Sequence, residues 1–186
     1  IVLSVLGVAL GVGVVVAMDL AIQSAREAFR VSTESVAGRS THRVVGSGTG
    51  VPDSLFTLLR VDLGLQESAP VVEGFLASPR LPGRPLRILG VDPFSERDFR
   101  PYLLGTSSGL DVTSLLAGGR GAFLGEELAE ALEVEVGAEI PIQPRGSAAT
   151  LHVAGILRPA DELSRAGIRD LVVADISRVQ EVLGMA

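Results

Sequence analysis

Residues 1–18 read IVLSVLGVALGVGVVVAM and carry no charged side chain. As an α-helix this run would rise roughly 27 Å at about 1.5 Å per residue, close to the ~30 Å hydrocarbon thickness of a bilayer. We therefore expect a transmembrane helix over residues 1–19. The alternative is a secretory signal peptide, which needs a basic leader and a small-residue cleavage site. No leader is visible and the stretch around Ala17 is a poor cleavage site, so the membrane span is favoured.

Small residues line one face of this predicted helix. Ser4, Gly7 and Gly11 lie three and four positions apart and include a G-x-x-x-G pattern. Such a face allows two membrane helices to approach closely. Glycine is also common in membrane helices for other reasons, so helix packing through these three residues is a hypothesis beside simple glycine enrichment.

The helical pattern continues beyond the apolar run. Ile22, Ala25, Phe29 and Val36 follow helical spacing while the charged residues fall elsewhere, which is typical of an amphipathic helix. We expect a stalk helix over residues 20–38, ended by the glycine at position 38. The alternative is an ordinary first helix of a globular domain, and periodicity does not separate the two.

The remaining residues, 39–186, predict one α+β domain. Short β-rich runs alternate with helical ones and are separated by glycine and proline, and this alternation favours a mixed architecture. The last two strands before position 160 should form a hairpin. The expected strands cover Thr41–Val45, Pro70–Ala77, Leu86–Val91, Ala122–Leu124, Glu139–Gln143, Thr150–Leu157 and Asp170–Ala174. The expected helices run from Pro52 through Leu59, over Asp111–Leu116 and Glu126–Leu132, and from an Asp175 cap through Leu183.

Composition excludes several classes of function. The formal net charge is −6, which argues against a nucleic-acid partner. All 16 basic residues are arginine, so the chain lacks the lysine of a P-loop and any amine for Schiff-base chemistry. The chain has no cysteine, which removes disulfides, thiolate metal sites and thiol catalysis.

Glycines and histidines offer weak candidate sites. The loop GSGTG at residues 46–50 could cradle an anion, but Val51 stands where a G-x-G-x-x-G pattern needs its third glycine. A flexible turn is the favoured interpretation. His42 and His152 both lie in predicted strands without acids at metal-ligand spacing, so neither predicts a metal site or a catalytic triad.

The acidic residues also favour structural roles. Asp92, followed by Pro93, predicts a turn in which the carboxylate accepts local backbone hydrogen bonds. Glu96 and Asp98 lie in the mixed-charge stretch FSERDFR, which we expect to be solvated. The acids of the helix at 126–132 are expected on its surface, among them Glu126, Glu127 and Glu130. We therefore predict no catalytic, cofactor-binding or metal-binding residue in this chain, and no enzymatic activity.

A family resemblance rests on several stretches in order. The apolar first helix is followed by AREAFRVSTESVAGRSTHRVVG (25–46), APVVEGF (69–75), LRILGVDPF (86–94), FLGEELAEAL (123–132) and DLVVADISRVQEVLG (170–184). Together they resemble the FtsX-like permeases of ABC transporters, above all the long members with two extracytoplasmic domains. The soluble part is similar to the MacB-type periplasmic core domain. The shared positions are apolar and turn residues, so they guide the fold better than the substrate.

The resemblance implies a bacterial inner-membrane permease whose residues from about 39 lie on the extracytoplasmic side. A separate ABC ATPase subunit would bind ATP, so no cofactor is expected in this chain. Other implied partners are the lipid bilayer, a second permease copy or homologue, and an envelope protein or lipoprotein. Such permeases transmit ATP-driven movement to extracytoplasmic events.

The chain starts without methionine and has no second apolar run, so we expect a fragment of a longer permease. Two other classes of function stay open. One is a membrane-anchored or secreted module that binds an extracytoplasmic ligand or partner. The other is an enzyme with an unrecognised carboxylate pair, for which Asp92 is the best candidate.

Overall fold

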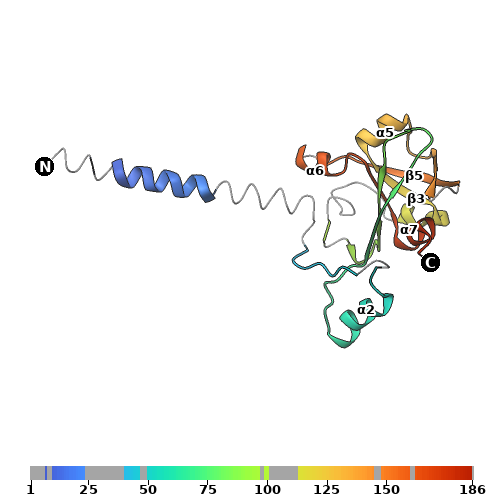
Figure 1. Cartoon of the computed structure of the whole chain (residues 1–186), viewed down its shortest axis with the longest axis horizontal. Helices are drawn as coiled ribbons and strands as arrows, with labels where there is room; N and C mark the ends of the chain where they lie inside the picture. Colours follow the sequence, from blue (N-terminus) through green and yellow to red (C-terminus); the bar gives the residue numbers. More distant parts are fainter. Residues whose placement is uncertain are drawn as a thin grey trace. The chain divides into compact units, whose positions relative to one another are not determined.

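The computed structural model describes residues 7, 10–23, 40–46, 50–96, 99–100, 113–144, 148–159 and 162–185. The chain divides into two compact units, Ile1–Gly38 and Arg39–Ala186. Figure 1 draws the described helix of the first unit in blue and labels several helices and strands of the second unit. Each unit is described below by itself.

The first unit contains a helix over residues 10–23. In the part of the chain that is described, no helix is both long enough and apolar enough to cross a membrane. Residues 24–38, which make up most of the predicted stalk, lie outside the described residues, as do residues 1–6 of the predicted span. The helix does extend past Met18 into the polar sequence, as the periodicity predicts.

The second unit is built on a six-stranded sheet with the order β1-β2-β6-β3-β5-β4. Its strands are β1 (Val71–Leu76), β2 (Leu86–Val91), β3 (Gly121–Gly125), β4 (Glu139–Ile142), β5 (Ala149–Leu157) and β6 (Leu171–Asp175). Two neighbouring pairs are parallel, β2 with β6 and β3 with β5, and the other three are antiparallel. The predicted hairpin is the antiparallel pair β4 and β5.

The sheet curls until its two edge strands meet. Beyond the ends of β1 and β4, Ala77 and Gln143 form an isolated antiparallel bridge, and the Gln143 N–H donates to the Ala77 carbonyl over 2.8 Å. The Ser78 hydroxyl reinforces this corner by donating to the Pro141 carbonyl over 2.9 Å. Pro141 has no N–H to donate to a neighbouring strand. Its position in β4, at the edge of the sheet, tolerates this missing donor.

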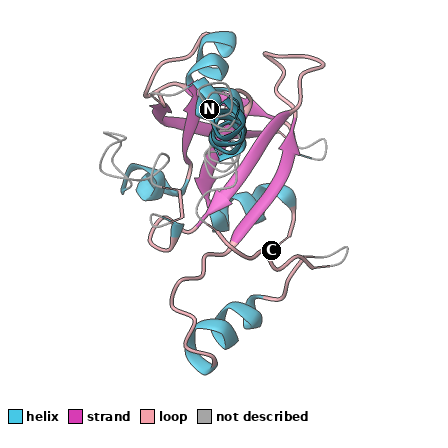
Figure 2. Ribbon diagram, turned by 90° about the vertical axis from the view of Figure 1, so that its left-hand side faces the viewer, coloured by secondary structure: helices cyan, strands magenta, loops and turns pink. Residues whose placement is uncertain are grey.

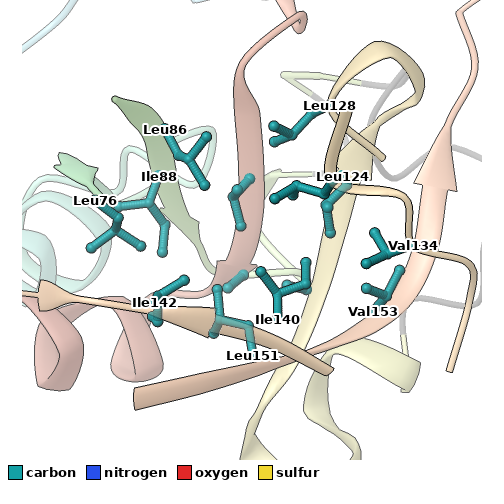
Figure 3. Packing of buried hydrophobic residues seen from close by; sticks show 14 of the residues in the cluster. Leu76, Leu86, Ile88, Leu124, Leu128, Val134, Ile140, Ile142, Leu151 and Val153 are labelled. Atoms are coloured by element: carbon teal, nitrogen blue, oxygen red, sulfur yellow. The ribbon is translucent and has the colours of Figure 1, made fainter. Parts of the chain in front are cut away.

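One hydrophobic core fills the concave side of the sheet. Helices α5 (Glu126–Leu132) and α7 (Ile176–Leu183) contribute side chains such as Leu128 and Val179 to this core. Figure 3 shows how leucine, isoleucine and valine side chains from the strands converge there. The labelled residues that share this cluster are Leu76, Leu86, Ile88, Leu124, Leu128, Val134, Ile140, Ile142, Leu151 and Val153.

A second core lies on the opposite face of the sheet. Phe123, fully buried, packs there with Leu89, Val91 and Val173. Leu115 from α4 (Thr113–Leu116), which is followed by the short turn η4 (Ala117–Gly119), covers this cluster. Because alternate residues of a strand point to opposite faces, β2 and β6 supply both cores, and this explains their unbroken apolar sequences.

A helical arm leaves the domain between residues 51 and 68. It holds α2 (Asp53–Thr57) and the π-helical turn η1 (Leu58–Asp62), and neither contains a buried residue. Figure 2 shows this arm standing away from the sheet on two connecting loops. Pro52 is the N-cap of α2, directly before its first helical residue.

Most predicted elements of the domain are confirmed, and the α+β class with them. The strand predicted over Thr41–Val45 is wrong, because residues 41–46 are described and take part in no strand. Their β-branched residues favour extended backbone, but a strand forms only where a neighbour supplies hydrogen bonds. Helix α6 (Glu162–Gly167), which packs Ser164 and the following Ile168 inward, was not predicted.

Candidate functional site

The turn after β2 orders a small polar cluster. Asp92 Oδ1 accepts a hydrogen bond from the Phe94 backbone N–H over 3.1 Å, and the Ser95 hydroxyl donates to Asp92 Oδ2. The predicted Asp-Pro turn is therefore confirmed. Asp92 makes the local contacts of a turn residue. Within the described residues it belongs to no group of acids and histidines that could bind a metal.

Glu96 corrects the expectation that FSERDFR is a solvated face. Its side chain is 0% exposed and pairs with Arg100, whose side chain is 14% exposed. The backbone explains the burial, because the N–H groups of Phe99 and Arg100 both donate to the Glu96 carbonyl over 3.0 Å. This turn brings the side chains of Glu96 and Arg100, four positions apart, together. Asp98, the other acid considered there, lies outside the described residues.

Glu96 Oε2 has no hydrogen-bond partner among the described residues, although the other carboxylate oxygen meets Arg100. A buried charge is stable only while its counter-ion stays in place. The Glu96 and Arg100 pair therefore fixes the loop that leaves β2, and this structural role could not be read from the mixed charges of the sequence.

Arg60 joins the helical arm to this polar cluster. Its guanidinium donates from Nη1 to Ser95 Oγ over 3.3 Å and from Nη2 to the Gln66 carbonyl over 3.0 Å. The same guanidinium lies 5.3 Å from the centroid of the Phe56 ring, within the range of a cation–π contact. The Gln66 side-chain amide in turn donates a hydrogen bond from Nε2 to the Arg60 carbonyl over 3.1 Å. One side chain therefore braces the arm and attaches it to the turn after β2.

Gly50, which precedes the helical arm, lies beside Met185, which follows α7. A Cβ added to Gly50 would lie 3.7 Å from Cε of Met185. Gly184 ends α7 in the left-handed conformation, and the Met185 N–H donates to the Gln180 carbonyl over 2.8 Å. A Cβ added to Gly46 would overlap the Gly50 carbonyl, so these two glycines lie in close contact. Residues 47–49 lie outside the described residues.

The remaining acids and histidines considered above make no joint site. The described residues contain no group of three His, Asp or Glu side chains that could hold a metal. His42 lies in an extended loop and bonds Thr41 Oγ1 through Nδ1 over 3.0 Å, while His152 is exposed on β5.

The first turn of α5 is bound by two arginines. Arg158 meets Glu126 over 2.8 Å, and Arg169 meets Glu127 over 2.7 Å. Both arginines come from loops next to strands, after β5 and before β6, so the pairs attach the helix to the sheet. Glu130 is exposed on the same helix. The predicted surface location of these acids is confirmed for Glu127 and Glu130, and Glu126 is partly covered.

The small-residue face of the first helix is described only in part. A Cβ added to Gly7 or to Gly11 would meet nothing within 4 Å, so both positions are open to a neighbouring helix. Ser4 lies outside the described residues. Packing through Ser4, Gly7 and Gly11 stays a prediction.

Comparison with known proteins defines the class. Residues 1–185 match the MacB-like periplasmic core domain family. The chain belongs to this family.

A curated relative places the family in a transporter. The chain is 38% identical over 184 residues to an uncharacterized ABC transporter permease protein from Mycobacterium tuberculosis. The match covers 99% of this chain and 21% of that protein, so the chain spans about a fifth of the relative's length. The resemblance to FtsX-like and MacB-like permeases stated above is thereby confirmed.

Proposed function

We propose that this chain is the part of an ABC transporter permease that carries a first membrane helix, a stalk and an extracytoplasmic core domain. The domain would couple ATP-driven motion to an extracytoplasmic substrate or partner. ATP would bind to a separate ATPase subunit, and a second permease copy or homologue would complete the assembly. The observation that carries the proposal is the family match over residues 1–185, supported by the permease relative.

The approach of Gly50 to Met185 supports a mechanical role. Gly50 precedes the helical arm and Met185 follows α7, and the two residues are neighbours, so a change in their separation would act on α7. That helix is tightly seated on the sheet. A Cβ added to Gly74 of β1 would lie 2.6 Å from a Leu183 methyl, and one added to Gly90 of β2 would lie 2.7 Å from Val179 Cβ. Packed interiors resist small deformations and transmit strain, so movement at α7 would pass into β1 and β2.

We also propose that the domain is not an enzyme. Asp92 and Asp175 accept local turn and cap bonds, and Glu96, Glu126 and Glu127 each face an arginine. Such carboxylates are occupied by structural contacts, whereas catalytic acids and bases need an open face toward a substrate.

Membrane topology tests the proposal directly. The chain has no cysteine, so Val136→Cys, at a residue 61% exposed, gives one defined label in this region of the full-length permease. We expect a membrane-impermeant maleimide to label Val136→Cys in intact cells, and Gly7→Cys to stay unlabelled until the membrane is dissolved. Labelling of Val136→Cys only after lysis would refute the extracytoplasmic location. Release of a labelled soluble domain would instead favour the anchored or secreted binding module.

A further inference from the structure

The helical arm presents apolar side chains to solvent. Leu58, Val61, Leu63 and Leu65 are 43%, 73%, 59% and 53% exposed, and we call these four residues the apolar arm surface. Helices as short as α2 and η1 are marginal alone and are usually stabilised by packing an apolar face. No residue of either helix is fully buried. Leu55, Phe56 and Leu59 are half-buried, and the apolar arm surface is left exposed.

The arm is nevertheless a fixed frame. The Leu63 N–H donates to the Leu58 carbonyl over 3.0 Å, and the Leu65 N–H donates to the Leu59 carbonyl over 2.8 Å. Arg60 adds its bonds to Gln66 and Ser95. A surface held in its binding conformation loses less entropy on association than a flexible one, so this arrangement suits a docking surface.

Charge indicates what could cover the surface. Asp53, Asp62 and Glu67 are exposed on the arm and form no ion pair within the described residues. The arm's arginine, Arg60, turns its guanidinium toward Phe56, Gln66 and Ser95 instead. The surface is therefore apolar with a negative rim. It would repel anionic lipid and a second copy of the same arm, and it would attract lysine or arginine.

We infer that the apolar arm surface docks a separate extracytoplasmic polypeptide whose apolar contact residues are flanked by lysine or arginine. The inference rests on the proposed function, because that function puts the domain, and therefore its partner, on the extracytoplasmic side of the membrane. Apolar anchors at the centre would supply most of the affinity, and the charged rim would set orientation and association rate.

Site-specific cross-linking in the full-length permease tests the inference. A photo-reactive benzoylphenylalanine replaces Val61 in the native host, and mass spectrometry identifies the cross-linked peptide. We expect a peptide from another polypeptide, with apolar residues beside lysine or arginine. The same probe at Val136, which is 61% exposed elsewhere on the domain, should not give this product.

A charge variant with a matched control completes the test. The variant Asp53→Asn, Asp62→Asn, Glu67→Gln should lower the cross-link yield about tenfold, since several ion pairs at the rim are lost together. The control Glu130→Gln, Glu135→Gln, Glu162→Gln changes the net charge equally at exposed sites outside the arm and should leave the yield unchanged. Cross-links to lipid, to the permease itself or to an acidic peptide, or equal yields from both variants, would overturn the inference. If Val136→Cys is labelled from outside while the cross-link fails, only the docking inference falls. Labelling from inside alone would instead refute the proposed function.

Discussion

Arg60 Nη1 donates to Ser95 Oγ over 3.3 Å, and this bond joins the helical arm to the turn that follows β2. Ser95 is 9% exposed and also donates to Asp92, so the arm is attached to a turn that is itself ordered. Since α2 and η1 hold no fully buried residue and Leu55, Phe56 and Leu59 are only half-buried, this guanidinium is an important attachment of the arm.

Replacing Arg60 should loosen the arm and leave the sheet intact. Arg60→Gln removes the bonds to Ser95 and Gln66 and the contact with Phe56. A contact of this kind contributes about 1 kcal/mol, so amide hydrogen exchange over residues 53–65 should accelerate roughly fivefold while β2 and β6 are unchanged. Arg80→Gln, at an exposed arginine outside the arm, is the control. Unchanged exchange in the arm would show that Arg60 does not hold it.

Glu96→Ala should destabilise the domain strongly. The substitution leaves Arg100, 14% exposed, without the carboxylate that it meets, and breaking a buried ion pair from one side costs about 3–5 kcal/mol. Urea unfolding should report a loss of that order. The double variant Glu96→Leu, Arg100→Leu should recover part of the loss, because it leaves no buried charge. A single-variant loss below about 1 kcal/mol would contradict the burial described here.

Gly90→Ala should cost more than Gly74→Ala. The new Cβ at Gly90 would lie 2.7 Å from Val179 Cβ and 3.2 Å from the Ile176 Cα, and neither atom moves without the helix. At Gly74 the nearest atoms are the terminal methyls of Leu183, which can rotate away. We expect a loss of about 1–3 kcal/mol in the unfolding free energy for Gly90→Ala and a smaller one for Gly74→Ala. The reverse order would show that α7 is not seated as described.

Asp175→Ala should weaken the start of α7. Asp175 Oδ1 accepts from the Ser177 N–H over 3.0 Å at the N-cap of the helix, and loss of such a cap costs about 1 kcal/mol. Thermal unfolding should show a lower midpoint for Asp175→Ala and a nearly unchanged one for Asp175→Asn, which keeps an acceptor oxygen. Equal effects of the two substitutions would point to charge instead of the cap.

Local sequence was sufficient for the elements whose signals are local. The strand Leu86–Val91 and the helix Glu126–Leu132 have the predicted bounds. An apolar run indicates the strand and an acidic first turn indicates the helix, and neither signal depends on distant residues. The two ends of α7 were predicted in the same way, because each depends on a single residue, Asp175 at the start and Gly184 at the end. The family resemblance added the class of protein, which no chemical motif in the chain reveals.

Features that depend on distant residues could not be predicted in this way. The strand order places β6 between β2 and β3, and nothing within those strands specifies their neighbours. The burial of Glu96 arises from a turn that brings Arg100 back over it, and the role of Arg60 arises from Ser95, which lies far along the chain. At Thr41–Val45 the local sequence predicts a strand that does not form, since its β-branched residues meet no partner strand.

We propose that ATP-driven movement reaches this domain where Gly50 lies beside Met185. The most direct measurement is the cross-linking rate of Val51→Cys with Met185→Cys by a short bismaleimide, in the full-length permease assembled with its ATPase. The pair Glu126→Cys with Arg158→Cys, which replaces an ion pair within the domain, is the control. We expect ATP trapped with vanadate to change the rate for the first pair and to leave the control pair unaffected. Equal rates for the first pair with and without trapped nucleotide would contradict it.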